Sequence, residues 1–396
     1  MILEFIHKKG QKEIIAFDTV FDVSKEWVQL DTNDKLSFIK SFLPAFRAKQ
    51  KIILFDKNHK QLQTFHEQNN INNLENIEEI NKDAQLLFFT SGSNGFPVGA
   101  FKTEANLLNE VSVLKELISE TQTIKRVVVS VPFAHIYGVL VGLLLPLSLD
   151  DVTLVVKDDF LPYELLEEAS YEDTLVITTP IFIKALARLE NSQNLSQTLF
   201  ISSTAPLSHE DVTGFLHNYH TNLIQLFGST ETGGIAYKHN LDEEWSPLQS
   251  VIVTQKEDKL SISSSFVSPF LLQKSCKTLS LPFVTEDIIE IRNKKFKLLG
   301  RSNKLIKIAG KRISANLIEM TLENLEDIEV AVVELVYKKE LLRSEQVIIT
   351  LQAKKKISKQ MIKDKISECY GVITIPFKVV YMEKINYSSM GKKILF

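Results

Sequence analysis

The chain has 396 residues, of which 44% are hydrophobic and 24% charged, so its composition is that of a soluble globular protein with two or three domains. Its 46 basic and 49 acidic residues leave a net charge of −3, and this near balance argues against general nucleic-acid binding. The eight histidines form no cluster, and the two cysteines, Cys276 and Cys369, lie far apart. This usage argues against a structural zinc site and favours a reduced, cytoplasmic protein.

The first three hundred residues alternate between strand-like and helix-like segments. Buried strands are predicted at residues 51–55, 127–131, 152–156, 174–177 and 198–202, and helices at residues 106–118, 181–189 and 209–217. Residues 69–79, rich in Asn and Glu, are predicted to form a surface connection. The alternation favours layered sheets covered by helices.

One segment has to be tested as a membrane span. Residues 127–149 contain no Asp, Glu, Lys or Arg and are long enough to cross a bilayer. Pro132, His135 and Pro146 interrupt the segment, so a strand, a loop and a buried helix explain it better than a span. Residues 1–9 lack the apolar core of a secretory signal, and no signal peptide is expected.

The pattern changes near Trp245, where hairpin-like strands begin and continue to residue 299. Beyond a polar turn at residues 300–303, helices are predicted at 316–325 and 359–369, and strands at 328–336, 346–352 and 377–382. We therefore place a domain boundary after residue 300. The predicted fold class is α/β, with a large N-terminal domain (residues 1–300) of layered βα sheets plus a β-rich subdomain, and a small α+β C-terminal domain (residues 301–396).

The loop after the apolar run that ends at Phe89 carries small polar residues. It holds hydroxyls at Thr90, Ser91 and Ser93 and glycines at Gly92 and Gly95. A strand, such a loop and a helix, in this order, allow backbone N–H groups to close on a phosphate. An ordinary turn is the alternative, and the loop is not a Walker A motif.

Four more segments accompany this loop. They read Val-Pro-Phe-Ala-His-Ile-Tyr-Gly (131–138), Gln-Leu-Phe-Gly-Ser-Thr-Glu-Thr-Gly-Gly (225–234), Gly-Arg-Ser-Asn-Lys-Leu-Ile-Lys-Ile-Ala-Gly-Lys-Arg-Ile (300–313) and Met-Gly-Lys-Lys-Ile (390–394). Together and in this order the five segments resemble the adenylate-forming (AMP-binding) superfamily of acyl- and aryl-CoA synthetases, peptide-synthetase adenylation domains and luciferases. The resemblance runs from Leu86 to the end of the chain and is specific, because five ordered segments rarely coincide by chance.

The resemblance implies an ATP site. Thr90, Ser91, Gly92, Ser93, Asn94 and Gly95 would hold the β- and γ-phosphates, and Thr204, Ala205, Pro206, Phe227, Gly228, Ser229 and Thr230 would surround the adenine. Asp287 would accept from the ribose hydroxyls, Arg301 would contact ribose and phosphate, and Glu231 would be the magnesium carboxylate. Taken alone, Glu231 is better explained as an ordinary turn carboxylate and Asp287 as a hairpin carboxylate, and only the resemblance favours the binding roles.

The resemblance also implies catalytic and pocket residues. Lys392 would stabilise the charge on the α-phosphate, and Lys307 with Gly310 would face a pantetheine tunnel after the mobile C-terminal domain rotates about a hinge at Asn303. His135, Tyr137, Gly138 and Gly233 would line the acyl pocket. The alternative for Lys392 and Lys393 is that they are solvated charges near a chain end.

The implied reaction is ligation of a carboxylic acid to a thiol. ATP and Mg²⁺ would give an acyl-adenylate and pyrophosphate, and CoA or a carrier protein's phosphopantetheine would then displace AMP. A carrier protein would dock on basic residues, for which Lys304, Lys307, Lys311 and Arg312 are candidates; a solvated face explains them equally well.

The alternative function is a non-catalytic adenylate-binding scaffold. Retention of Glu231, Asp287, Arg301 and Lys392 argues against it.

The chain departs from the family pattern at several places, among them Asn303 at the hinge and Asn386-Tyr387-Ser388 before the final lysine. Val98 stands where the phosphate loop usually has lysine, and Lys102, four residues on, is a candidate to supply that charge. Glu286 stands where glycine is usual. Only 89 residues precede Thr90, so we expect an abbreviated first subdomain, as in short bacterial carboxylate–thiol ligases that activate aryl or short acyl acids.

Overall fold

The computed structural model describes residues 1–8, 10–16, 23, 27–57, 83–91, 97–189, 192–273, 276–302, 305–308, 311–337, 345–371, 376–387 and 393–395. The chain divides into two units. The first comprises Met1–Ile252 and Ile262–Phe283, and the second comprises Val253–Ser261 and Val284–Phe396. The boundary expected after residue 300 stays a prediction.

Among the described residues, the first unit is built on a nine-stranded sheet of order β13-β12-β11-β10-β9-β7-β8-β1-β2. Its strands are β1 (Ile2–Ile6), β2 (Lys12–Ile15), β7 (Arg126–Val129), β8 (Thr153–Lys157), β9 (Thr174–Thr178), β10 (Thr198–Ser202), β11 (Asn222–Ser229), β12 (Gly233–His239) and β13 (Ser246–Pro247). The strands from β11 to β1 run parallel, and β2, β12 and β13 add antiparallel edges. Every residue of β9 and β10 is buried, as expected for parallel strands covered on both faces.

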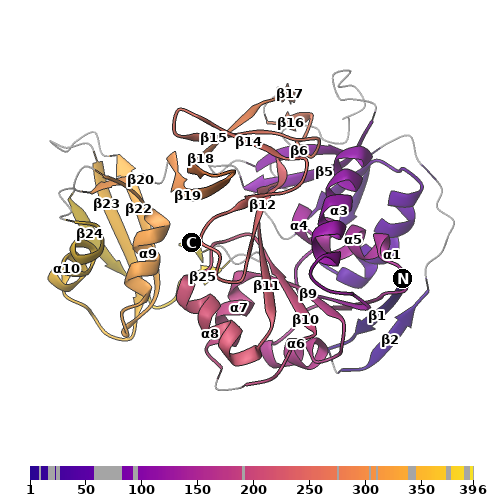
Figure 1. Cartoon of the computed structure of the whole chain (residues 1–396), viewed down its shortest axis with the longest axis horizontal. Helices are drawn as coiled ribbons and strands as arrows, with labels where there is room; N and C mark the ends of the chain where they lie inside the picture. Colours follow the sequence, from indigo (N-terminus) through magenta and orange to yellow (C-terminus); the bar gives the residue numbers. More distant parts are fainter. Residues whose placement is uncertain are drawn as a thin grey trace. The chain divides into compact units, whose positions relative to one another are not determined.

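Three helices cover one face of this sheet (Figure 1). They are α6 (Pro162–Ala169), α7 (Pro180–Ala187) and α8 (His209–Tyr219). Phe215 of α8 packs on Phe200 of β10 and on Tyr219 of its own helix, and all three belong to one buried cluster. The helix begins where the Ser208 side chain accepts from the amide of Asp211, the usual way to satisfy a free N–H at a helix start.

A second sheet of the same unit has the order β17-β16-β6-β5-β4-β3 among the described residues. Its strands are β3 (Val28–Asp31), β4 (Ile52–Phe55), β5 (Ala84–Ser91), β6 (Pro97–Thr103), β16 (Phe270–Leu272) and β17 (Cys276–Thr278), and α1 (Lys35–Arg47) follows β3. Helix α3 (Glu104–Ser119) starts at a capping box between Thr103 and Asn106. It packs on β5 and β6 and on the helices that follow β7.

The apolar segment after β7 folds into three short helical pieces, α4 (Ile136–Val139), the π-helical η2 (Leu140–Leu144) and α5 (Leu145–Ser148). Residues 136–146 are buried throughout. Their apolar side chains are therefore explained by the core of the first unit. No helix in the described part of the chain has both the length and the apolar character needed to cross a membrane.

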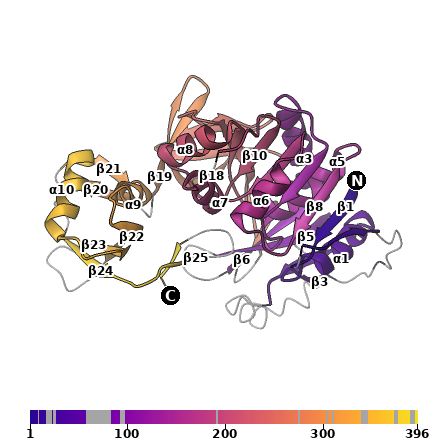
Figure 2. The same ribbon diagram turned by 90° about the horizontal axis from the view of Figure 1, so that it is seen from below.

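The second unit contains four small sheets among its described residues (Figure 2). They have the orders β14-β15-β18-β19, β20-β21, β22-β23-β24 and β25-β26. Their strands are β14 (Ile252–Lys256), β15 (Lys259–Ser263), β18 (Phe283–Arg292), β19 (Lys295–Arg301), β20 (Leu305–Ile308), β21 (Lys311–Ser314), β22 (Ile328–Tyr337), β23 (Glu345–Ala353), β24 (Phe377–Tyr381), β25 (Asn386–Tyr387) and β26 (Lys393–Ile394). Helices α9 (Ala315–Glu323) and α10 (Lys359–Tyr370) pack side by side on the β22–β24 sheet.

The predicted elements agree with the observed ones to within a few residues. The helix predicted at 209–217 is α8, and the strand predicted at 198–202 is β10. The hairpin β1–β2 was not predicted, and the connection expected at 69–79 lies outside the described residues.

Candidate active site

The predicted phosphate loop joins two neighbouring strands of the six-stranded sheet, β5 and β6. The order of strand, loop and helix expected from the sequence is therefore wrong, because β6 stands between the loop and α3. Thr90 and Ser91 end β5, Pro97 begins β6, and Thr90 lies opposite Val98 in the antiparallel pair. The pairing therefore fixes both ends of the predicted loop. The intervening predicted residues lie outside the described part of the chain and keep their role as a prediction; they are Gly92, Ser93, Asn94 and Gly95.

The turn that carries Glu231 connects β11 to β12, and close backbone contacts fix its shape. A Cβ atom on Gly228 would lie 2.3 Å from the carbonyl oxygen of Gly233, so only glycine fits at that position. The amide of Ser229 donates to Oγ1 of Thr232 at 3.0 Å, which closes the turn. Glu231 lies in this turn and is half-buried. One well-placed carboxylate is enough to bind Mg²⁺ when phosphate oxygens supply further ligands.

The two predicted adenine-side segments lie at the ends of neighbouring strands. Because β10 and β11 are parallel and paired, the residues after β10 and the last residues of β11 lie at the same edge of the sheet. Residues 204–206 follow β10, and Thr204 has a left-handed φ of 90°. The hydroxyl of Ser203 donates to the carbonyl oxygen of Leu226 at 2.9 Å, which joins this turn to β11 one residue before Phe227.

Trp245 lies beside Phe227 and belongs to no motif found in the sequence. Its ring centroid lies 5.4 Å from that of Phe227, and Nζ of Lys238 lies 4.8 Å from the Trp245 centroid. Burial lowers the pKa of Lys238, against the opposing charges of Asp242 and Glu243. An aromatic pair with a nearby cation is suited to stacking on a flat ring.

Lys102 does not supply charge to the phosphate loop, and that interpretation of the sequence is wrong. Its side chain is fully buried, and Nζ donates to the carbonyl oxygen of Phe266 at 2.6 Å and to that of Glu231 at 3.4 Å. Glu110 of α3, which the sequence analysis missed, is 4% exposed and accepts from the amide of Gly234 at 2.7 Å. Burial lowers the pKa of Lys102 and raises the pKa of Glu110, while the charge of each opposes the shift of the other.

Three of the four predicted acyl-pocket residues lie in the segment after β7, and the fourth, Gly233, begins β12. His135 is half-buried at the start of α4. The hydroxyl of Tyr137 donates towards the carbonyl oxygens of Thr178 (3.1 Å) and Ile201 (2.9 Å), and burial raises its pKa. Tyr137 thus joins the ends of β9 and β10, and Gly138 is required because a Cβ atom would lie 2.0 Å from a carbonyl oxygen. Their role in lining an acyl pocket stays a prediction.

In the second unit, the two predicted ribose residues lie opposite each other. Asp287 of β18 pairs with Arg301 of β19, and Nε of Arg301 donates to Oδ1 of Asp287 at 3.1 Å. The Asp287 side chain is 10% exposed and that of Arg301 52% exposed. The neighbouring Glu286 binds Ser302 and Lys259, and these two hydrogen bonds lower its pKa.

Lys393 is not a solvated terminal charge, so that alternative is wrong for it. Its ammonium group lies 3.0 Å from a carboxylate oxygen of Glu319 and 2.6 Å from one of Glu323, both on α9. It also donates to the carbonyl oxygen of Ala331 at 2.8 Å. The preceding residue, Lys392, lies outside the described residues, as does Asn303; Lys307 is in β20, and its side chain is not described.

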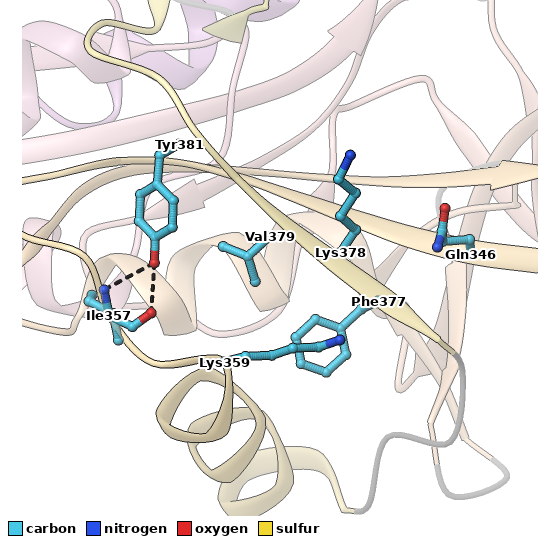
Figure 3. A pocket seen from close by; sticks show the side chains of 7 residues that line it. All are labelled: Gln346, Ile357, Lys359, Phe377, Lys378, Val379 and Tyr381. Carbon is cyan, nitrogen blue, oxygen red and sulfur yellow. Dashed lines mark hydrogen bonds between the residues drawn. The ribbon is translucent and has the colours of Figure 1, made fainter.

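A shallow hollow in the second unit contains none of the predicted site residues (Figure 3). It is lined by Gln346, Ile357, Lys359, Phe377, Lys378, Val379 and Tyr381. Nζ of Lys359 lies 4.7 Å from the ring centroid of Phe377, and the hydroxyl of Tyr381 donates to the carbonyl oxygen of Ile357 at 2.7 Å. The hollow is a feature of the β22–β24 sheet and α10, and we assign it no part in the chemistry. Within the described ranges, no three His, Cys, Asp or Glu side chains gather as a metal site.

Comparisons with known proteins show which proteins this chain resembles. A Staphylococcus aureus protein provisionally named long chain fatty acid-CoA ligase VraA is 26% identical over 329 residues, which are 77% of this chain and 68% of that protein. The 4-coumarate–CoA ligase of Halorhodospira halophila is 26% identical over 241 residues, 60% of this chain and 56% of that protein.

Solved structures show the same fold. ATP-bound MatB from Rhodopseudomonas palustris aligns with a TM-score of 0.79 at 15% identity, covering 99% of this chain and 94% of that one. O-succinylbenzoate Coenzyme A Synthetase (MenE) from Bacillus subtilis, in complex with ATP and magnesium ion, aligns with a TM-score of 0.77 at 16% identity, covering 99% and 95%. A family model described as AMP-binding enzyme matches residues 19–254, more than half of the chain. The chain therefore belongs to the AMP-binding enzyme family.

Proposed function

We propose that this protein is an ATP-dependent acid–thiol ligase that forms an acyl-adenylate and then a thioester. The observation that carries the proposal is the family match over residues 19–254, which contain the Thr90 loop end and the Glu231 turn. A carboxylate oxygen of the acid attacks the α-phosphorus of ATP, and the bond to pyrophosphate breaks. A thiolate sulfur then attacks the acyl carbon, and AMP leaves with the electrons of the broken C–O bond.

The protein's part in this chemistry is positioning and charge neutralisation. Thr90 and the loop after it would hold the outer phosphates, Asp287 and Arg301 the ribose, and Lys392 the α-phosphate. Glu231 would hold Mg²⁺, which neutralises phosphate charge when bound. Lys307 is proposed for the thiol step.

For the thiol acceptor we propose CoA, because the relatives reported above carry the names of CoA ligases. Those names also include a long-chain fatty acid and an aryl acid, so the substrate class is an acyl or aryl carboxylic acid. A carrier-protein phosphopantetheine is the second candidate acceptor, and supplying each thiol separately distinguishes the two.

Release of pyrophosphate tests the function directly. The protein should release pyrophosphate from ATP and Mg²⁺ only when a suitable acid is present, across a panel of aryl acids and fatty acids of graded length. Hydroxylamine should trap the activated acid as a hydroxamate, and CoA should convert it to a thioester. ATP binding without pyrophosphate release across the panel, with either thiol present, would instead support the non-catalytic scaffold.

Replacing Asp287 by Asn should weaken ATP binding, because an amide keeps the shape but not the charge that holds Arg301. Hydrogen bonds to charged groups contribute about 1.5–3 kcal/mol, so we expect KM for ATP to rise about tenfold or more, with a smaller change in kcat. Glu290→Gln is the matched control on the same strand, since Glu290 pairs with Arg292 at an exposed site. Equal KM values for ATP in the two variants would contradict the ribose assignment.

A further inference from the structure

The first unit buries a lysine and a glutamate beneath the Glu231 turn. Lys102 lies on β6 and Glu110 lies on α3, and their side chains are 0% and 4% exposed. Ionised groups are costly to bury unless they are paired and hydrogen-bonded. The burial of Lys102 and Glu110 has to be explained by the groups that they bind.

The two groups bind the two ends of one short backbone segment. The Lys102 ammonium donates to the carbonyl oxygen of Glu231 at 3.4 Å, and the Glu110 carboxylate accepts from the amide of Gly234 at 2.7 Å. The Lys102 ammonium also donates to the carbonyl oxygen of Phe266 at 2.6 Å. The amide of Ser268 donates to the carbonyl oxygen of Glu231 at 2.8 Å, so this oxygen is held from two sides.

The turn leaves room for the Glu110 carboxylate. Gly233 has a φ of 70°, and a Cβ atom on it would lie 2.5 Å from Oε2 of Glu110. A Cβ atom on Gly234 would lie 2.9 Å from Oε1. Contacts under 3.0 Å do not occur for real Cβ atoms without a shift, so the two glycines and the carboxylate fit one another.

We infer that Lys102 and Glu110 are positioning residues that fix the backbone of residues 231–234 and thereby hold Glu231 in place for the magnesium–nucleotide. The inference rests on the proposed function, because it gives Glu231 its metal. Neither residue touches the reacting atoms. Their effect on the metal is indirect: they orient the carboxylate ligand, as hydrogen-bond partners of metal ligands do in other proteins.

The test measures the Mg²⁺ concentration that half-saturates acid-dependent pyrophosphate release. We expect Lys102→Met and Glu110→Gln each to raise it about tenfold or more, the usual effect of removing an outer-shell partner. Lys35→Met is the matched control: Lys35 is another buried lysine of the same unit, 6% exposed, whose Nζ donates to the carbonyl oxygen of Lys157 at 2.9 Å. It should lower the melting temperature and leave the Mg²⁺ requirement as it is in the wild type.

A merely structural role is excluded or established by the same data. If the Lys102 and Glu110 variants melt earlier but keep the wild-type Mg²⁺ requirement, as expected for Lys35→Met, the inference is wrong. Should either single variant fail to fold, the neutral double variant Lys102→Met/Glu110→Gln and the variant Gly234→Ala carry the test, and both should show the raised Mg²⁺ requirement. Mg²⁺-dependent ATP binding is measured alongside. Its absence in the wild type would overturn the proposed function, whereas an active wild type with unchanged variants overturns the inference alone.

Discussion

Replacing Lys392 by Ala should lower the rate of adenylate formation by ~10²–10³, because its positive charge is proposed to stabilise the α-phosphate as the acid attacks. ATP should still bind, since the other proposed nucleotide contacts come from Thr90, Glu231, Asp287 and Arg301. The measurement is acid-dependent pyrophosphate release in rapid mixing, with ATP affinity determined separately. The expected pattern is a fall in kcat with little change in ATP affinity.

The control for Lys392→Ala is Lys355→Ala in the same unit, which removes an exposed lysine paired with Asp327. That variant should form adenylate at the wild-type rate. Wild-type adenylation by Lys392→Ala would show that the catalytic assignment is wrong. A scaffold protein would change in neither rate nor ATP binding, so the same experiment separates the two functions.

The layers of the fold could be predicted from the sequence because their signals are local. The strands β9 and β10 appear in the sequence as short runs of mostly β-branched or aromatic residues, and α8 as a helix-like segment. The hairpin β1–β2 gave no comparable signal. Its first strand pairs with β8, about 150 residues away, and the sequence near Ile2 does not contain that partner.

The same reason explains what the sequence analysis missed in the candidate site. A lysine at position 102 looks like any loop-flanking charge, and its burial depends on carbonyl oxygens 129 and 164 residues further along the chain. Glu110 had a weak local signal, a carboxylate beside Leu107 and Val111 on the buried side of a predicted helix. The positions of residues in known motifs were easier to predict than those of Lys102 and Glu110. Asp287 and Arg301 were expected to contact the same ribose, and they lie opposite each other on β18 and β19.

Replacing Lys393 by Met should destabilise the second unit, because the two carboxylates that the ammonium neutralises would remain buried. The side chains of Lys393, Glu319 and Glu323 are 18%, 12% and 13% exposed, and the two carboxylates also accept from the amides of Val333 and Ala331. Breaking a buried ion pair by removing one partner costs about 3–5 kcal/mol, and the partial exposure here places the expected loss at the lower end. Thermal unfolding followed by circular dichroism measures it, with Lys355→Met as the exposed-lysine control, which should change the melting temperature little.

The pH dependence of this stabilisation has a defined sign. Burial opposes the charge on Lys393, but Glu319 and Glu323 outweigh it and raise the pKa of Lys393 above 10.5. A group whose pKa is higher in the folded state stabilises that state fully below its unfolded pKa, and the contribution disappears as the pH rises through the folded pKa. The stability difference between wild type and Lys393→Met should therefore be constant from neutral pH to about pH 10 and shrink above it. A difference that is already small at neutral pH would show that the cluster contributes nothing to folding, and that Lys393 does not anchor the strand that follows Lys392.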